Sequence, residues 1–172
     1  PAAQAAGSLQ QELLELKSQL LAFETLYQVS LDMHKLTSSL EVFQFLAVEL
    51  VTQLGFVDCS FFVPTQASLQ RVAYHSHGQL SQPEPPAAIE IAQLHLVAAC
   101  ARQRQPTQTC EDGVIALAVP VFGVDELWAV MYLRFVGCAN EYPNLPLMQK
   151  MGEVVSRKLS QLADRQKLQQ SI

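Results

Sequence analysis

The segment that most constrains the fold covers residues 114–135 and reads VIALAVPVFGVDELWAVMYLRF. Two apolar runs flank the turn-like residues 123–126, and this pattern predicts a β-hairpin. An antiparallel hairpin usually leaves one face to water and alternates apolar with polar residues, but almost every side chain here is apolar. Both faces of this hairpin must therefore be covered, either by other parts of the protein or by a ligand.

Side chains alternate in size along the first strand of the hairpin. The small residues Ala116 and Ala118 share one face with Pro120, and the other face carries Ile115, Leu117, Val119 and Val121. In the second strand we assign Leu127, Met131 and Leu133 to the bulky face, and Trp128, Val130, Tyr132 and Arg134 to the small face. We predict that the bulky face packs on helices. The small face, with the polar groups of Tyr132 and Arg134, is a candidate ligand pocket. The alternative is that the third helix and the Pro-rich loop fill this space and leave a closed core.

The N-terminal residues carry a helical pattern with two apolar stripes. Steps of four and three residues form a heptad seam of Leu9, Leu13, Leu16, Leu20, Phe23 and Tyr27. A second series with the same steps is rotated on the helix and contains Leu26, Val29, Met33, Leu36 and Leu40. We predict that the first stripe pairs with another helix, and that the second packs on the sheet. The alternative is one amphipathic helix within a single bundle.

Further segments complete the order of elements. LTSSLEVFQFLAVELVTQLGF predicts a second helix with Ser38 or Ser39 as its N-cap and Gly55 at its end. VDCSFFV and LQRVAYH predict two strands, and AAIEIAQLHLVAACARQRQ predicts a third helix that Pro106 ends. The last helix is expected from Leu147 to about Leu168. The order predicts an α+β domain framed by its terminal helices.

Length and charge limit the class of protein. With 172 residues, of which 49% are hydrophobic, the chain can bury a core of its own. Acidic residues outnumber basic ones by 16 to 11, so the positive footprint of a nucleic-acid binder is missing. Apolar runs are too short for a membrane span, and the N-terminus does not read as a signal peptide. We therefore expect a soluble, cytoplasmic chain, or a cytoplasmic fragment of a longer one, without membrane contact.

Cysteines and histidines supply few candidate ligands. The four cysteines are far apart in sequence and form no CxxC pair. We therefore expect free, packed thiols and no structural zinc. His75 and His77 lie two apart on a strand and could meet His95 from the third helix at a haem or a metal. The spacing fixes no supporting carboxylate, so we predict edge and surface histidines, and no metal or cofactor.

The elements together resemble a GAF domain between about Leu26 and Leu162. The most specific part is the hairpin, where AVPV, a turn and LWAVMYL are similar to the apolar strands of that family. The resemblance implies a central antiparallel sheet with the N- and C-terminal helices on one face and a small-molecule pocket on the other. It divides the chain into a coiled-coil signalling helix (1–25), a GAF domain (26–163) and the start of a linker helix (164–172).

The resemblance also suggests where a ligand binds, and the heptad seam suggests where a partner binds. The pocket is predicted to contain Phe61, His95, Ala116, Ala118, Val130, Tyr132 and Arg134. The homodimer interface is predicted to contain Leu9, Leu13, Leu16, Leu20 and Phe23. Bilin-binding relatives attach the chromophore through Cys-His, whereas here Cys100 precedes Ala101 and Cys110 precedes Glu111. Cyclic-nucleotide-binding relatives carry an Asn-Lys pair, which this sequence lacks.

The predicted function is that of a non-catalytic sensory GAF domain from a bacterial signalling protein, such as a diguanylate cyclase or histidine kinase. It would dimerise through its terminal helices and pass a small-molecule or conformational signal to a covalently linked output domain. One alternative is a sensor that binds haem or another cofactor. The other is a thiol-dependent enzyme similar to methionine sulfoxide reductases, in which Cys100 and Cys110 would approach each other.

Overall fold

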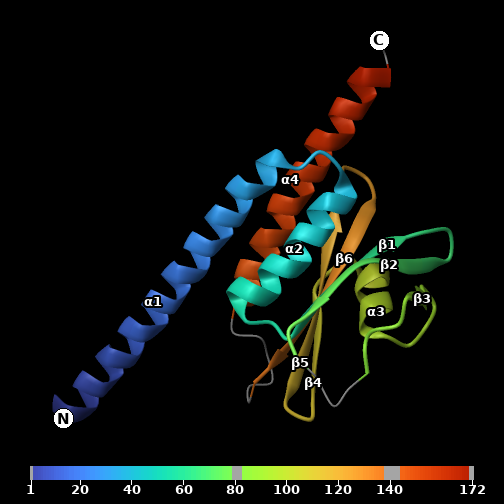
Figure 1. Ribbon diagram of the computed structural model, residues 1–172. Helices are drawn as coiled ribbons and strands as arrows, with labels where there is room; N and C mark the ends of the chain where they lie inside the picture. The colour runs from blue at the N-terminus through green and yellow to red at the C-terminus, as the bar shows by residue number, and fades with distance from the viewer. Residues whose placement is uncertain (1, 79–82, 138–143, 171–172) are drawn as a thin grey trace.

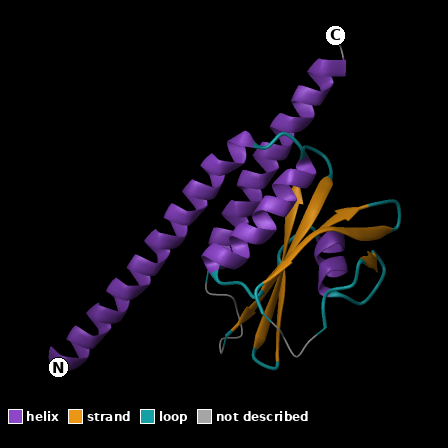
Figure 2. Ribbon diagram, viewed as in Figure 1, coloured by secondary structure: helices purple, strands orange, loops and turns teal. Residues whose placement is uncertain are grey.

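Six strands form one antiparallel sheet in the computed structural model, which describes residues 2–78, 83–137 and 144–170 (Figures 1 and 2). The strand order across the sheet is β3-β2-β1-β6-β5-β4. The strands are β1 Asp58–Pro64, β2 Ser68–Ser76, β3 Ala88–Glu90, β4 Thr107–Glu111, β5 Val114–Phe122 and β6 Leu127–Val136. The hairpin predicted around residues 123–126 is β5–β6, and it lies well inside the sheet. This arrangement confirms the predicted α+β class.

Helices cover both faces of the sheet (Figure 1). The longest is α1 Ala2–Asp32, which is followed by the short 3₁₀ helix η1 Met33–Lys35. The others are α2 Ser39–Leu54, α3 Leu96–Gln103 and α4 Leu145–Gln170. The end of α1 lies with α2 and α4 on one face, and α3 lies on the other. No helix of the described residues is long and apolar enough to cross a membrane.

The bulky face of β5 packs against helices, as its pattern predicts. Leu117 and Val119 belong to one core with Leu46 of α2 and with Met151 and Val155 of α4. Residues 114–121 of β5 are all buried. Fully burying an aliphatic side chain of this size stabilises the fold by about 1.5–3 kcal/mol, so this core is a main source of stability.

The small face of the hairpin is covered by protein as well. Ala116, Ala118, Val130 and Tyr132 form a second cluster with residues of β1, β2, β3 and α3, namely Phe62, Leu69, Ile89, Val97, Ala98 and Cys100. The continuous apolar character of the hairpin therefore has a structural cause, because each face supports a core of its own.

The start and end of α2 follow from three residues. Ser38 is the N-cap, and its hydroxyl accepts a hydrogen bond from the Glu41 amide at 3.2 Å. The Glu41 carboxylate in turn accepts one from the Thr37 amide at 3.0 Å. Gly55 ends the helix with φ +77°, a left-handed conformation that favours glycine. Of the two serines that the sequence offered as caps, Ser38 is the one used.

The predicted third helix is shorter than expected, and its first part is a strand. Ala88–Glu90 forms β3, in which Ile89 pairs with Leu69 of β2 and both side chains are buried. Helix α3 covers only Leu96–Gln103 and ends at Arg104, which has φ +56°. The prediction was wrong here because pairing with the sheet edge decides the conformation of these residues, and local pattern does not reveal such a partner.

A β-bulge changes two of the predicted faces in β6. The register with β5 shifts between Val121 and Phe122, so Val121 pairs with Ala129 and Phe122 with Leu127. As a result Trp128 packs on the helix-side core, and Leu127 packs on the cluster under α3. Both assignments made from strict alternation were therefore wrong, whereas the faces predicted for residues 130–133 are correct.

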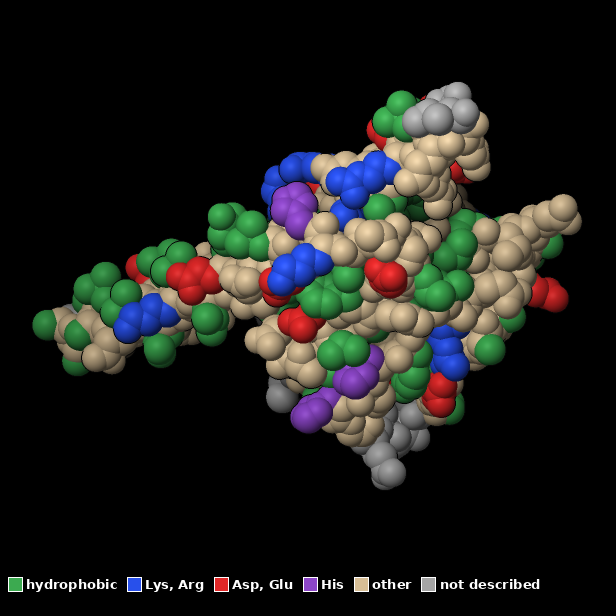
Figure 3. Space-filling view, turned by 45° about the horizontal axis from the view of Figure 1, so that its top comes forward, with side chains coloured by type: hydrophobic (Ala, Val, Ile, Leu, Met, Phe, Trp, Pro, Cys, Tyr) green, Lys and Arg blue, Asp and Glu red, His purple; other side chains and the backbone are tan. Residues whose placement is uncertain are grey.

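Helix α1 changes its environment along its length. Val29 and Met33 are buried in the helix-side core, and Leu40 of the same predicted series is exposed. The heptad seam is 52–65% exposed at Leu9, Leu13, Leu16, Leu20 and Phe23. Figure 1 shows this part of α1 projecting away from the sheet, and Figure 3 shows hydrophobic side chains along it. The apolar stripe of α4 does not cover the seam, because its residues Met151, Val155, Leu159 and Leu162 face the domain core.

Candidate functional site

Strand register gathers polar side chains on the face of the sheet that α3 covers. Ser60 of β1 pairs with Tyr74 of β2 on one side and with Tyr132 of β6 on the other. In the next row, Asp58 pairs with Arg134. Directly opposed residues of antiparallel strands share a face, so these five side chains lie together. We call Asp58, Ser60, Tyr74, Tyr132 and Arg134 the polar floor.

The charges of the polar floor neutralise each other. Nε of Arg134 donates to both carboxylate oxygens of Asp58 at 3.0 Å, and Nη2 donates to Oδ2. The Tyr74 hydroxyl lies 3.4 Å from Asp58 Oδ2, and Nη1 of Arg134 donates to the Pro83 carbonyl at 2.9 Å. Burial acts to lower the pKa of Arg134, but the hydrogen bond and charge of Asp58 outweigh it, and the pKa is raised. Arg134 is thus a permanent cation whose donors already serve Asp58 and the segment around Pro83.

Ser60 has a polar atom that the protein does not satisfy. Its side chain is buried, and its Oγ has no hydrogen-bond partner among the described residues. A buried hydroxyl left in this state costs about 1–3 kcal/mol. Its cross-strand neighbour Tyr132 is nearly buried, and burial raises the pKa of the Tyr132 phenol. The two hydroxyls are therefore neutral groups that can donate to or accept from a ligand on this face.

His95 begins α3 over the same face. Its Nδ1 accepts a hydrogen bond from the Val97 amide at 3.1 Å, so the imidazole is the N-cap of the helix. The ring lies 5.7 Å from the Tyr132 ring, centroid to centroid. Burial lowers the pKa of His95, so the neutral ring with its proton on Nε2 is favoured. Sequence reasoning missed the capping role, because histidine is not a common N-cap residue.

The predicted pocket residues are only partly brought together. His95, Ala116, Ala118, Val130 and Tyr132 all lie on the α3 face, and Arg134 lies there bonded to Asp58. Phe61 was assigned to the wrong face, since it stacks on Phe43 of α2 at 5.0 Å in the helix-side core. Its neighbour Phe62 occupies the α3 face instead. Two consecutive phenylalanines do not reveal which of them faces which side.

The other histidines stay away from His95. His75 pairs with Cys59, which belongs to the helix-side core, so His75 faces the opposite side of the sheet from His95. Within residues 2–78, 83–137 and 144–170 no three His, Cys, Asp or Glu side chains are grouped to hold a metal ion. The possible haem or metal constellation of His75, His77 and His95 is therefore not assembled.

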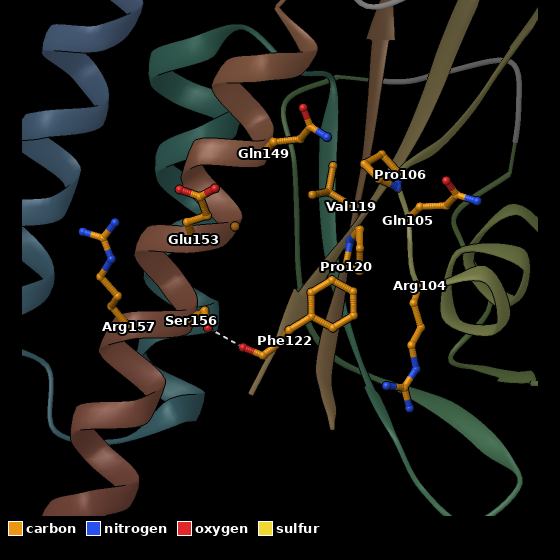
Figure 4. A pocket seen from close by; sticks show the side chains of 11 residues that line it. Arg104, Gln105, Pro106, Val119, Pro120, Phe122, Gln149, Glu153, Ser156 and Arg157 are labelled. Carbon is orange, nitrogen blue, oxygen red and sulfur yellow. Dashed lines mark hydrogen bonds between the residues drawn. The ribbon is translucent and has the colours of Figure 1, made fainter. Parts of the chain in front are cut away.

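A separate cleft of about 460 Å³ opens between α4 and β5 (Figure 4). It is lined by Arg104, Gln105, Pro106, Val119, Pro120, Phe122, Gln149, Gly152, Glu153, Ser156 and Arg157. A Cβ added at Gly152 would lie 3.4 Å from the Pro120 carbonyl oxygen, and Ser156 Oγ donates to the Phe122 carbonyl. Sequence reasoning missed this cleft, although a glycine within an amphipathic helix and a proline within a strand could have indicated the close approach.

The fold can be compared with solved structures, since no family model and no curated protein matches the sequence. The putative GAF sensor protein from Burkholderia vietnamiensis is similar with a TM-score of 0.70, 14% identity, and coverage of 84% of this chain and 92% of that one. The GAF domain of a phosphoenolpyruvate-protein phosphotransferase from Coxiella burnetii also reaches 0.70, at 11% identity, with coverage of 86% and 98%. The chain has the GAF fold. The expected resemblance is thereby confirmed at the level of the fold.

The GAF fold also occurs in enzymes. Free methionine-R-sulfoxide reductase from Neisseria meningitidis matches with a TM-score of 0.73 at 11% identity, covering 85% of this chain and 92% of that one. Identities this low establish the shared fold alone. Sensors and reductases both have this fold, so the chemistry of the individual residues must decide between these functions.

The thiols of this GAF-like domain do not form a reactive pair in the described residues. Burial raises the pKa of Cys59 well above its ordinary value and that of Cys100 to about 12. Cys110 is partly exposed, but it packs toward the helix-side core whereas Cys100 lies in the cluster under α3. The predicted approach of Cys100 and Cys110 is therefore not observed. Cys138 lies outside the described residues.

Proposed function

We propose that this GAF-like domain is a non-catalytic sensory module that dimerises through its terminal helices. A small molecule binds on the polar floor, and the sheet transmits the resulting change to α1 and α4. These helices pass it to a second copy of the chain and to a covalently linked output domain. The observation that carries the proposal is that single strands of the sheet contribute side chains to both cores.

The strands β5 and β6 belong to both cores at once. Ala118 and Tyr132 face the α3 side, and their chain neighbours Leu117, Val119 and Met131 face the helices. Protein cores are packed at the density of organic crystals, so a shift of a strand on one face displaces its contacts on the other. The helix-side contacts include Val155 and Leu159 of α4 and Met33 of η1, which directly follows α1, as parts of the same core. Binding at the floor can therefore move the terminal helices.

The polar floor supports a neutral or weakly polar ligand. The fork of Arg134 is already bound to Asp58, and the unpaired Ser60 hydroxyl is the buried group that gains most from a ligand atom. Tyr132 lies beside it across the strand. A ligand with one carbonyl or hydroxyl group fits this chemistry better than a strongly charged one.

The exposed seam of α1 supports the dimer. Leu16 is 62% exposed and Leu20 is 60% exposed, although both belong to a regular heptad stripe. A helix that projects without tertiary contacts is marginally stable in water. Packing the seams of two copies together would bury them in a parallel arrangement that suits signal transmission.

The test compares the wild-type chain with Leu16→Glu/Leu20→Glu by sedimentation velocity at micromolar concentration. We expect the wild type to sediment as a dimer and the double variant as a folded monomer with an unchanged domain core. The matched control is Gln11→Glu/Ser18→Glu, which puts the same charges on the opposite face of α1 and should remain dimeric. A monomeric wild type would refute the dimer and the transmission route together.

The reductase function is the second candidate, because two solved free methionine-R-sulfoxide reductases share the fold with TM-scores of 0.73 and 0.67. The buried, poorly ionised thiols of Cys59 and Cys100 weigh against it. Incubating the wild type with free methionine-R-sulfoxide and a dithiol reductant decides between the two functions. Turnover that is lost in Cys110→Ser would establish the enzyme, and absence of turnover supports the sensor.

A sensor that binds haem or another coloured cofactor is distinguished by its visible absorption spectrum after purification. The separation of His75 from His95 by the sheet argues against shared haem ligation. An absorption band that is lost on His95→Ala would favour this alternative.

A further inference from the structure

A second hollow of the molecule lies where the end of α1 meets α4. It measures about 190 Å³ and is lined by Ser30, Met33, His34, Val154, Arg157, Lys158 and Gln161. This groove is separate from the polar floor, because it lies on the far side of the helix layer.

The polar lining of the groove consists of hydrogen-bond donors and contains no carboxylate. Ser30 offers a hydroxyl, Gln161 an amide, His34 an imidazole, and Arg157 and Lys158 permanent or near-permanent cations. None of these five side chains forms a hydrogen bond or an ion pair within the described part of the chain. In Figure 4, Arg157 is directed away from Phe122, toward the side of α4 on which α1 lies. The groove thus presents donors that have no acceptor.

Lys158 adds a second cation to the groove. The residue is only 5% exposed, but the buried part is its alkyl chain, because the ammonium nitrogen is not among the buried polar atoms that lack a partner. Burial lowers the pKa of Lys158, and the nearby cation of Arg165 lowers it further. The ammonium has no acidic partner among the described residues, so an anion bound beside Lys158 would gain a charge-assisted hydrogen bond.

Charges of both signs lie close in sequence to the lining residues of the groove, in a chain with a net charge of −5, and the nearby carboxylates are Asp32, Glu153 and Asp164. Lys35 follows His34 in η1, and Arg165 lies two turns after Lys158 on α4. Figure 3 shows Lys and Arg side chains grouped around a histidine close to the base of the projecting helix. Within the lining itself the permanently charged side chains are those of Arg157 and Lys158, so the field inside the groove favours small anions.

A purely structural role for these cations is the competing explanation. The C-terminus of α1 carries a partial negative charge, and cations near a helix C-terminus stabilise the helix. However, neither Arg157 nor Lys158 donates to a carbonyl of α1 among the described residues. The dipole alone therefore leaves the donors of both side chains without an acceptor in the described residues.

We propose that the groove between α1 and α4 binds the phosphate group of a small molecule, either as inorganic phosphate or as a phosphate monoester. A tetrahedral dianion matches two cationic side chains surrounded by neutral donors, and guanidinium and ammonium groups bind phosphate through short, charge-assisted hydrogen bonds. A volume of about 190 Å³ admits a phosphate group with only a small substituent.

Phosphate in this groove would bridge the two terminal helices. Ser30 and His34 belong to the end of α1 and to η1, and Arg157, Lys158 and Gln161 belong to α4. A ligand held by both sides fixes the position of one helix relative to the other and so biases any movement between them. The binding site itself does not depend on the proposed sensory function, and its test is independent of dimerisation.

The test is calorimetric titration of the full chain with inorganic phosphate, and separately with glycerol 3-phosphate, in a buffer free of other oxyanions. We expect dissociation constants of about 0.1–1 mM for the wild type. Lys158→Met keeps the length of the side chain and removes its charge, and it should weaken binding at least tenfold. Arg157→Gln should weaken it by a similar factor. Lys150→Met is the matched control, because Lys150 lies on the same helix, pairs with Glu153 and is outside the groove.

Each outcome of these titrations either supports or refutes the phosphate site. Binding that is lost in Lys158→Met and Arg157→Gln but kept in Lys150→Met supports the site, and the two ligands tell whether free or esterified phosphate is preferred. No heat of binding up to about 10 mM phosphate, or equal affinity in all variants, would refute the site. If Lys158→Met does not fold, as judged by circular dichroism, Arg157→Gln decides alone, since Arg157 is exposed.

Discussion

Ser60 has a hydroxyl whose hydrogen bonds are unmet in the ligand-free protein. We therefore expect Ser60→Ala to leave the free energy of unfolding unchanged or to raise it by up to about 1 kcal/mol, because the variant no longer buries an unpaired polar group. Urea denaturation measures this difference. The control is Ser68→Ala, which removes a hydroxyl that lies 2.8 Å from that of Thr65 and should lower stability slightly.

A clear loss of stability in Ser60→Ala would mean that the hydroxyl has a partner in solution, such as an ordered water molecule. The polar floor would then have no group in need of a ligand. The proposal of a small-molecule site under α3 would lose its main physical reason.

Arg134 and Asp58 form a buried pair, 5% and 1% exposed, that connects β6 with β1. Arg134→Met should lower the free energy of unfolding by about 3–5 kcal/mol, because it leaves the Asp58 carboxylate buried without its partner. The double variant Asp58→Leu/Arg134→Met should recover much of the loss, since an apolar pair needs no neutralisation. Thermal and urea denaturation of the three chains provide the measurement, and additive losses would contradict this account of the pair.

At the scale of elements, the cap of α2 offers a direct test of local structure. Ser38→Ala should cost about 1 kcal/mol of stability, because the Glu41 amide loses its acceptor. Ser39→Ala lies one residue later inside the helix, where alanine is favourable, and should cost nothing or stabilise. Urea denaturation distinguishes them. A larger loss at Ser39 would place the N-cap one residue further along the chain.

The helices with strong local signals were predictable from the sequence. A serine cap, an apolar stripe and a terminal glycine define α2, and all three act within a few residues of the chain. Residues 88–90 lacked such a local cause, because their strand exists only through pairing with Ser68–Gln70 some twenty residues earlier. The helix predicted over residues 87–105 therefore began too early, and only the second half of that range is helical, as α3.

The candidate site was predictable where side chains alternate without interruption. Ala116, Ala118, Val130 and Tyr132 follow the period of two and lie on the expected face. The bulge beside Phe122 places Leu127 and Trp128 on the faces opposite to those predicted. Phe61 and Phe62 are consecutive and both apolar, so the pattern did not show which of them faces α3. The Asp58–Arg134 pair also escaped sequence reasoning, because 76 residues separate its members and only the register of β1 against β6 brings them together.

At the scale of the whole molecule, α1 and α4 carry the proposed signal, and the orientation of the dimer decides whether they can. A parallel pairing in register places each seam residue opposite its own copy along the helix. Leu9 and Phe23 are 14 residues apart, which corresponds to about 21 Å of helix. An antiparallel pairing can bring at most one of these two positions opposite itself, so the two positions together report the orientation.

We therefore expect Leu9→Cys and Phe23→Cys, tested as separate variants, each to form an intermolecular disulfide rapidly under mild oxidation. Both cysteines would then lie within the Cα separation of about 4.4–6.8 Å that a disulfide allows. Ser18→Cys, which faces away from the seam, should cross-link slowly, and the unsubstituted chain gives the background of its own four cysteines. Non-reducing electrophoresis over time measures the rates. Rapid cross-linking at only one of the two seam positions would indicate antiparallel helices, which point the two copies of α1 in opposite directions and exclude a shared output along the dimer axis.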